Sequence, residues 1–141
     1  MKEWHYLNSV YDPDEETLKS FVGFVYLLTN ESTGKMYVGK KLFWSTRRLP
    51  PLKGKKLRRK KVVQSDWKTY HGSSGDVQAL VEDGQVFTRE ILHLCESRGM
   101  CSYLEAKEQF DRDVLMSDEY YNEFIGCKIH SRHLTKKKIS V

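Results

Sequence analysis

Residues 24–39, FVYLLTNESTGKMYVG, contain two short apolar runs on either side of a turn-like segment. Each run holds β-branched or aromatic residues, which are typical of strands. The intervening NESTG predicts a turn, in which Gly34 is free to adopt a positive φ. The stretch therefore predicts a β-hairpin with Tyr26 on its first strand and Tyr37 on its second.

The register of this hairpin decides where the two tyrosines point. A loop of two or four residues centred on 31–34 pairs Tyr26 with Gly39. Tyr37 then lies on the same face as Tyr26, as a diagonal neighbour with Cα atoms ~7–8 Å apart. A loop of odd length would place the rings on opposite faces. We expect the shared face, and with it a pair of neighbouring hydroxyls.

Length and composition predict one intracellular domain. The 141 residues are 39 % hydrophobic and 30 % charged, which suits a single globular domain. No apolar stretch approaches the ~20 residues of a membrane helix, and the N-terminus lacks the apolar core of a signal peptide. We therefore expect a cytoplasmic protein with no membrane segment. The three cysteines are expected to be reduced, because an odd number leaves one unpaired in any disulfide scheme.

The basic residues are concentrated in two stretches. Residues 40–61 hold eleven Lys or Arg and no acid, and residues 127–141 hold five more and no acid. The rest of the chain has 8 basic and 19 acidic residues, a net charge near −11. An acidic body with two basic segments indicates a polyanionic partner, and nucleic acid is the partner we expect.

The segments around the hairpin carry weaker signals. Residues 1–20 are polar and mixed, and predict a lead-in segment with a short helix from Asp14. KKLFWSTRR at 40–48 predicts the start of a helix that the following Pro-Pro pair ends. The Lys- and Arg-rich stretch 48–66 predicts a basic loop, and residues 127–141 predict a basic tail.

The second half predicts one strand and two helices. A helix over 76–83 is capped by Ser73 or Ser74, a strand covers 85–95, and a long helix covers 100–116. The apolar stripe expected along the long helix comprises Tyr103, Ala106, Phe110 and Val114. Together the elements predict an α/β (α+β) fold, a small central three-stranded antiparallel sheet flanked by helices.

The hairpin and the residues after it resemble the GIY-YIG nuclease family. Phe24-Val25-Tyr26 matches the first motif, with its leading Gly replaced, and Tyr37-Val38-Gly39 matches the second. Arg47 lies eight residues past Gly39, where the family has an arginine, although the basic stretch after it is longer than expected. The resemblance covers about residues 22–123 and is nearest to small phage-encoded nucleases, including homing-type enzymes.

Two later features extend the resemblance. The family has a metal-binding glutamate on a later helix, and the long helix offers Glu105 and Glu108. The inward edge of that helix favours Glu105, with Glu108 as the alternative. The family's Tyr-Asn pair is matched by Tyr121-Asn122, of which Asn122 would form hydrogen bonds within the site or brace the loop after the helix.

The resemblance implies an endonuclease that hydrolyses DNA phosphodiester bonds with Mg²⁺ or Mn²⁺. Tyr26 would relay a proton from the attacking water, provided that its pKa falls, and Tyr37 would position water or phosphate. Arg47 would bind phosphate oxygens as a planar, permanently charged fork. His71 is a second candidate base or orienting residue. Of these residues, Tyr26, Tyr37 and Arg47 are expected to converge with Glu105 on one cleft.

DNA contacts are expected from the basic residues. The candidates are Lys40, Lys41, Arg48, Lys53, Lys55, Lys56, Arg58, Arg59, Lys60, Lys61 and Lys68. An alternative function from another class is a non-catalytic nucleic-acid-binding module that keeps the nuclease fold. The joint presence of two tyrosines, an arginine and a helix glutamate favours the enzyme.

Overall fold

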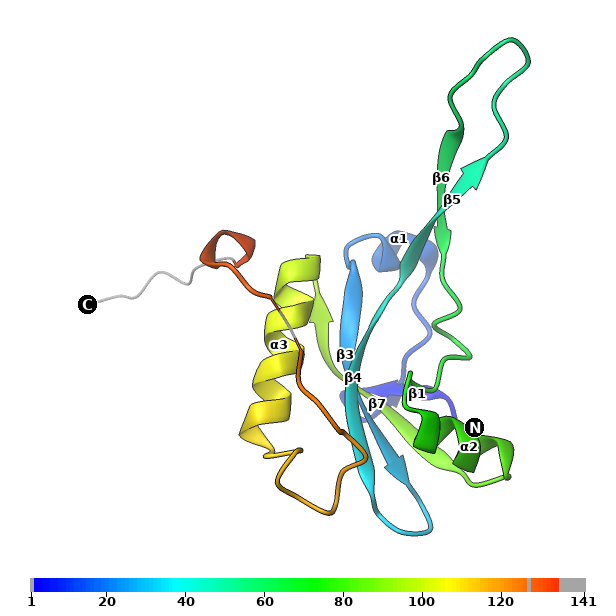
Figure 1. The fold of residues 1–141 in the computed structure, drawn as a ribbon. Coiled ribbons are helices and arrows are strands. Elements are labelled where there is room, and N and C mark those ends of the chain that lie inside the picture. The colour runs from blue at the N-terminus through cyan, green and yellow to red at the C-terminus, as the bar shows by residue number, and fades with distance from the viewer. Residues whose placement is uncertain (1, 127, 135–141) are drawn as a thin grey trace.

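The core of the fold is a five-stranded mixed sheet (Figure 1). The computed structural model describes residues 2–126 and 128–134. The strands are β1 (Trp4–Tyr6), β2 (Ser9–Val10), β3 (Gly23–Asn30), β4 (Met36–Leu42) and β7 (Phe87–Cys95). Their order is β2-β1-β7-β3-β4, and β1 runs parallel to β7 whereas the other neighbouring pairs are antiparallel. The three predicted strands, β3, β4 and β7, are antiparallel to their neighbours among themselves, but the prediction of a purely three-stranded antiparallel sheet is wrong because β1 and β2 extend the sheet.

The first residues of the chain belong to the sheet and are not a lead-in segment. The Trp4 side chain is only 2 % exposed, and its indole Nε1 donates a hydrogen bond to the Trp67 carbonyl at 2.7 Å. A strand of three residues is too short to show periodicity, so no pattern in the sequence indicated it. The short helix α1 (Glu15–Leu18) begins where predicted, after the N-cap Asp14.

The two longer helices differ from their predictions in detail. α2 (Gly75–Glu82) is capped by Ser74, one of the two predicted caps. α3 (Arg98–Asp111) begins earlier and ends earlier than predicted, and a 3₁₀ helix, η1 (Ser131–His133), follows near the end of the described chain. None of the helices in the described residues is long and apolar enough to cross a membrane.

Of the stripe predicted along α3, only Ala106 is a buried position of the helix. Phe110 is 64 % exposed and Tyr103 is 39 % exposed, and the buried Val114 lies beyond the end of the helix. The buried positions on α3 are Cys101, Ala106 and Gln109. Small and polar side chains face the sheet, whereas the hydrophobicity of the aromatic residues suggested the opposite.

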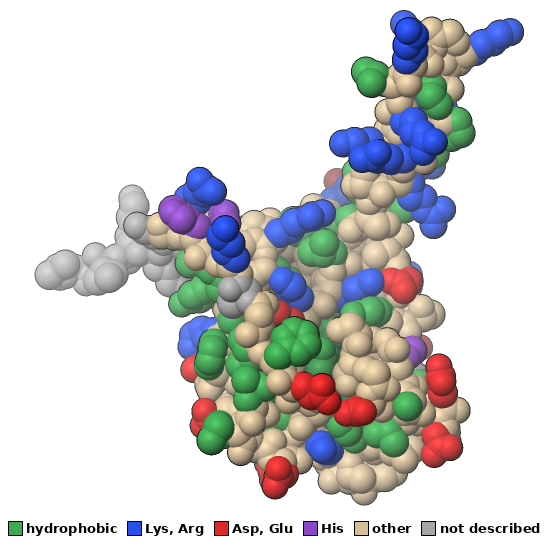
Figure 2. Space-filling view, viewed as in Figure 1, with side chains coloured by type: hydrophobic (Ala, Val, Ile, Leu, Met, Phe, Trp, Pro, Cys, Tyr) green, Lys and Arg blue, Asp and Glu red, His purple; other side chains and the backbone are tan. Residues whose placement is uncertain are grey.

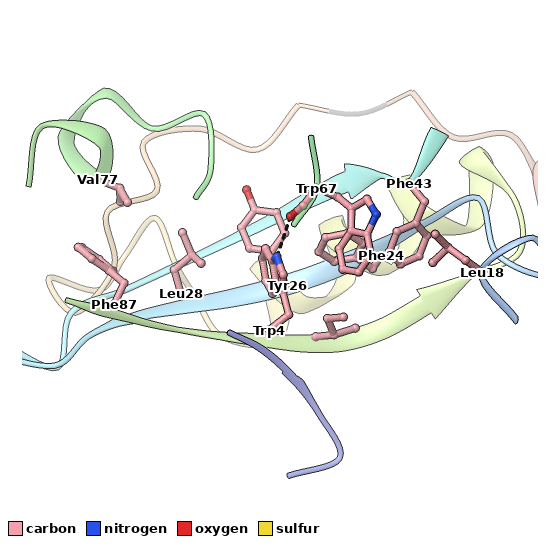
Figure 3. Close-up of a cluster of buried hydrophobic side chains, with 10 residues drawn as sticks. Trp4, Leu18, Phe24, Tyr26, Leu28, Phe43, Trp67, Val77 and Phe87 are labelled. Carbon is pink, nitrogen blue, oxygen red and sulfur yellow. Dashed lines mark hydrogen bonds between the residues drawn. The ribbon is translucent and has the colours of Figure 1, made fainter. Parts of the chain in front are cut away.

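The two faces of the sheet bury different kinds of side chain. α3 covers one face, where Cys101 packs with Val25, Leu27 and Val38. The other face carries a cluster of buried aromatic rings (Figure 3). This cluster contains Trp4, Phe24, Tyr26, Phe43, Trp67 and Phe87, together with Leu18, Leu28, Val77 and Ile91. Tyr26 is therefore held in the core by its ring as well as by its strand.

The basic stretch after the hairpin is a second hairpin, and the predicted helix over 40–48 and loop over 48–66 are corrected accordingly. β5 (Trp44–Leu49) and β6 (Arg59–Gln64) form a separate two-stranded sheet. Figure 1 shows this β5–β6 arm projecting from the body of the molecule. The loop was predicted because a run of like charges is typical of a solvated loop. Such a run can also form a two-stranded ribbon when both faces of the ribbon are exposed to solvent.

Candidate active site

The register of the tyrosine hairpin is the even-length one that was expected. Tyr26 pairs with Gly39 and Leu28 pairs with Tyr37. The Asn30 amide donates to the Lys35 carbonyl at 2.9 Å, which leaves residues 31–34 as the loop. The rings of Tyr26 and Tyr37 consequently lie on one face, with their centroids 6.3 Å apart.

Gly39 lets the Tyr26 ring lie against the β4 backbone. A Cβ atom at position 39 would fall 2.6 Å from Cζ of Tyr26 and 3.0 Å from Cε1 of Tyr37. Gly72 approaches the same ring from the 67–72 loop, since a Cβ there would lie 3.4 Å from the Tyr26 hydroxyl. Gly72 also has a φ of +92°, which glycine adopts without strain. Two glycines thus fix the place of the Tyr26 hydroxyl.

A cavity of about 650 Å³ opens at this point. Its walls come from the hairpin, from the start of α2, from α3 and from the segment after α3. They include Tyr26, Tyr37, Gly39, Lys40, Ser73, Ser74, Asp76, Glu105, Gln109, Tyr121, Asn122, Glu123 and Phe124. β4 is the edge strand of the sheet. The Tyr26 side chain on one face and the Glu105 carboxylate of α3 on the other can therefore both reach the cavity at this edge.

The segment after α3 forms hydrogen bonds with the edge strand β4 beside the cavity. The backbone of Met36 pairs with the segment after α3. Its amide donates to the Glu119 carbonyl, and its carbonyl accepts from the Tyr121 amide. Asn122 then brackets Val38, accepting from its amide at 3.0 Å and donating to its carbonyl at 2.8 Å. Of the two roles expected for Asn122, the structure shows the bracing one, at a position that also lines the cavity.

The two helix glutamates have different surroundings. Glu105 lines the cavity, whereas Glu108 does not. Glu108 accepts hydrogen bonds from His93 Nε2 at 2.8 Å and from Arg112 Nε at 2.9 Å. Partial burial raises the pKa of Glu108, but the bonds from Arg112 and His93 outweigh burial, so that its pKa lies below the ordinary value. The geometry places Glu105 at the cavity and gives Glu108 a structural ion pair.

Glu105 is held as a partly desolvated carboxylate. Burial raises its pKa above the ordinary value of 4.5, and the Lys40 ammonium and backbone amide oppose this only in part. Lys40 also donates from Nζ to Ser102 Oγ at 2.6 Å, which keeps its charge beside α3. The cavity therefore contains a carboxylate whose ionisation depends on one neighbouring cation.

Both hairpin tyrosines stay protonated at neutral pH in the metal-free protein. Burial raises the pKa of Tyr26 well above 10.0, and nearby Tyr70, Tyr37 and Glu105 raise it further. Burial also raises the pKa of Tyr37, although a hydrogen bond with Ser73, 3.4 Å between the two oxygens, partly opposes this. A fall of the Tyr26 pKa is expected only beside a metal-bound water and Arg47, and it stays a prediction. With the pKa raised by burial, the neutral phenols are hydrogen-bond donors.

Two predicted site residues lie away from the cavity. Arg47 is exposed on β5 and does not line the cavity, so the predicted convergence does not extend to it. Counting eight residues from Gly39 assumed a family-like element there, whereas the arm carries this position outward. His71 lies just before Gly72, with Nδ1 3.4 Å from the Thr69 carbonyl, and it also lies outside the cavity lining.

Tyr70 is a neighbour of the site that the sequence reasoning missed. Its ring lies edge-on to Tyr26, with centroids 6.0 Å apart. Lys41 Nζ lies 4.2 Å from the centroid of that ring and pairs with Asp66 at 2.6 Å. The available signal was the run of aromatic and basic residues before Gly72. Asp76 and Glu123, two further acids at the cavity, had no sequence signal.

The candidate DNA-binding residues fall into three places. Lys40 lines the cavity, Lys41 is paired with Asp66, and Lys68 is exposed with Nζ 5.8 Å from the Trp67 ring centroid. The remaining candidates are all exposed on the β5–β6 arm (Figure 2): Arg48, Lys53, Lys55, Lys56, Arg58, Arg59, Lys60 and Lys61. Of the predicted basic tail, residues 127 and 135–141 lie outside the described part of the chain.

The position of Lys40 predicts a shift in the pH dependence of any reaction at the cavity that needs ionised Glu105. Because the Lys40 charge lowers the Glu105 pKa, Lys40→Met should raise that pKa further. An activity that needs ionised Glu105 should then lose its acidic limb at higher pH than the wild type. The pH–rate profile measures this, with the carboxyl pKa followed by NMR. An acidic limb that moves to lower pH in the variant would contradict the assignment.

One of three comparisons with known proteins gave a match. The sequence model of the family described as "Putative endonuclease segE, GIY-YIG domain" matches residues 4–125, a span from β1 to the segment after Asn122. Searches of curated proteins and of solved structures gave no significant match. The match covers most of the 141 residues and includes β1, the hairpin, the arm and α3. The chain therefore belongs to the segE-type GIY-YIG endonuclease domain family.

Proposed function

We propose that the protein is a divalent-metal-dependent DNA endonuclease that hydrolyses phosphodiester bonds at the Tyr26–Glu105 cavity. The observation that carries the proposal is the meeting of Tyr26, Tyr37 and Glu105 across Gly39, although α3 is far from the hairpin in sequence. The family assignment supports a nuclease, and the exposed basic arm supports DNA as its substrate.

The donor set of the cavity fits Mg²⁺ or Mn²⁺. The carboxylates of Glu105, Asp76 and Glu123 and the hydroxyls of Tyr37 and Ser73 all line it, and these are hard oxygen donors. In the described residues no group of three or more His, Cys, Asp or Glu is arranged to hold a metal ion. Mg²⁺ is often bound through one or two carboxylates with water completing its shell, so Glu105 would suffice as the protein ligand. A bound dication would polarise the phosphate and neutralise the leaving oxygen.

The residues of the chain would do the positioning. Tyr37 is half-buried with its hydroxyl near Ser73, and as a neutral phenol it would donate to a phosphate oxygen or orient the attacking water. Tyr26 is 1 % exposed, and it would hold the Tyr37 ring in place and help to orient the water. Lys40 would supply positive charge at the cavity, where the family's arginine was expected. Of the two roles expected for tyrosine, these pKa directions favour water positioning.

Plasmid cleavage tests this function directly. The full-length protein should convert supercoiled DNA to nicked or linear forms with Mg²⁺ or Mn²⁺, and EDTA should stop the reaction. Removing the metal should cost several kcal/mol of transition-state stabilisation, on the order of 10³-fold or more in rate. Cleavage that is equally fast in EDTA would contradict the metal dependence.

The position of Arg47 favours one alternative, a non-catalytic DNA-binding module with a nuclease fold. With Arg47 on the arm, no arginine is found among the described residues that line the cavity. This alternative predicts DNA binding without cleavage under any metal condition. The plasmid assay run beside a gel-shift assay separates the two functions, because only the enzyme changes the plasmid.

A further inference from the structure

The β5–β6 arm has features that a structural hairpin would avoid. Among the described residues its strands pair only with each other, so that they bury little apolar surface, and such isolated ribbons are marginal in water. Arg47 lies directly opposite Lys61, and Arg48 lies directly opposite Lys60. Like charges in directly opposed positions destabilise a strand pair. Residues 44–64 contain no acid that could offset them.

Basic side chains occupy both faces of the arm. Strand alternation places Arg48 and Lys60 on one face, with Val62 beside them, and Arg47, Arg59 and Lys61 on the other. A ribbon that lay flat on a phosphate backbone would need positive charge on one face only. Charge on both faces suits a ribbon lying between two phosphate walls. The major groove of B-form DNA, about 12 Å wide, admits a two-stranded β-ribbon.

The composition of the arm favours duplex over single-stranded DNA. Single-strand binders stack bases on aromatic side chains, and residues 45–64 contain no Phe, Tyr, Trp or His. The exposed large side chains are aliphatic: Leu52, Leu57 and Val62 are 51 %, 86 % and 63 % exposed. Aliphatic groups suit contact with thymine methyl groups in the major groove. Duplex RNA offers a deep and narrow major groove that such a ribbon does not enter.

The arm also has a defined reach. β4 leads into β5 in nearly the same direction (Figure 1), and the ten residue-to-residue steps from Gly39 to Leu49 would span at most about 33 Å. One turn of duplex DNA is about 34 Å. The outer end of the ribbon therefore lies about one helical turn from the cavity.

We propose that the β5–β6 arm binds in the major groove of duplex DNA about one helical turn from the phosphate at the cavity. Groove binding by the arm rests on the arm alone. The distance to the scissile phosphate rests on the proposed nuclease function. The arm thereby anchors the duplex, and the cavity acts on a site set by that anchor.

The first test measures the binding of the full-length protein in EDTA to three probes of about 30 nucleotides or base pairs. The probes are a DNA duplex, one of its single strands and a duplex RNA. Arg48→Gln/Lys60→Gln is compared with Lys19→Gln/Lys107→Gln, which removes the same charge from exposed positions outside the arm. Loss of two phosphate contacts should lower the slope of log K against log salt by about 1.8 on duplex DNA. The control pair should leave it unchanged.

The outcomes separate this inference from the proposed function. Equal slopes for both double variants, or an equal drop on single strands or duplex RNA, would overturn groove binding even if the protein cleaves plasmid. A duplex-specific drop would support it even if the protein does not cleave. If it cleaves, hydroxyl-radical footprinting should show protection about one turn from the cut, and that protection should weaken in Arg48→Gln/Lys60→Gln only. Protection confined to the cut site would overturn the stated reach.

Discussion

Replacing Glu105 with glutamine is expected to lower plasmid cleavage about 10³-fold or more while DNA binding is retained. The amide is a much weaker ligand for a hard dication than the carboxylate, and Glu105 is the helix glutamate that lines the cavity. Affinity should depend mainly on the exposed arm, which the substitution does not touch. Single-turnover cleavage and gel-shift binding, measured on the same preparation, test both parts.

The same variant should be at least as thermally stable as the wild type at neutral pH. The folded-state pKa of Glu105 is raised, so folding favours its protonated form. Its contribution to stability is present at low pH and is lost as pH rises through the folded pKa. At pH 7 the carboxylate is ionised at a cost that a neutral glutamine avoids. A melting temperature at or above that of the wild type is the expected result.

Glu108→Gln is the matched control, with the opposite pattern. It lies one turn along α3, outside the cavity, and its pKa is lowered by bonds from Arg112 and His93. Its stabilisation is present above the ordinary pKa and is lost as pH falls through the folded one. The variant should cleave normally and be less stable at pH 7 by about 1 kcal/mol, a typical figure for partly exposed ion pairs.

Together, the two variants show which glutamate, if either, holds the metal. If Glu108→Gln is inactive and Glu105→Gln cleaves normally, the metal is held by the other glutamate. If both variants cleave normally with added Mg²⁺, the metal site is elsewhere. Loss of activity in Glu105→Gln together with a lower melting temperature would indicate a structural role.

The parts of the site that the sequence predicted are those with local signals. The hairpin, its register and the shared face of Tyr26 and Tyr37 follow from alternation and from the length of one turn. Glu105 was favoured over Glu108 by helix phase, and the structure places Glu105 at the cavity. The phase was right for this residue although Tyr103 and Phe110 were wrongly placed inward.

The parts that failed depend on contacts between distant residues or on spacing carried over from relatives. β1 pairs with β7, more than eighty residues later, and three residues carry no period that would reveal it. Arg47 was placed at the site by counting from Gly39, yet β5 carries this position away from the cavity along the arm. Tyr70 reaches Tyr26 only through the fold of the 67–72 loop.

Substituting Gly39 with alanine is expected to damage both the fold and the site. The new Cβ would fall 2.6 Å from Cζ of Tyr26, well inside van der Waals contact. The ring has little room to move, because it packs against Trp4, Phe24 and Tyr70. Overpacking costs about 1–3 kcal/mol and outweighs the ~0.4–1 kcal/mol that Gly→Ala gains through the unfolded state. Thermal unfolding should show the net loss.

The same clash should displace the Tyr26 hydroxyl from the cavity and lower cleavage about 10²-fold, the effect typical of a ~1 Å misplacement. Gly75→Ala is the matched control for stability, because a Cβ at Gly75, also at the cavity, meets nothing within 4 Å. Tyr26→Phe separates the two effects, since it removes the hydroxyl and keeps the ring. It should lose activity with a smaller loss of stability than Gly39→Ala. Full activity and unchanged stability in Gly39→Ala would show that the ring does not depend on the open backbone at position 39.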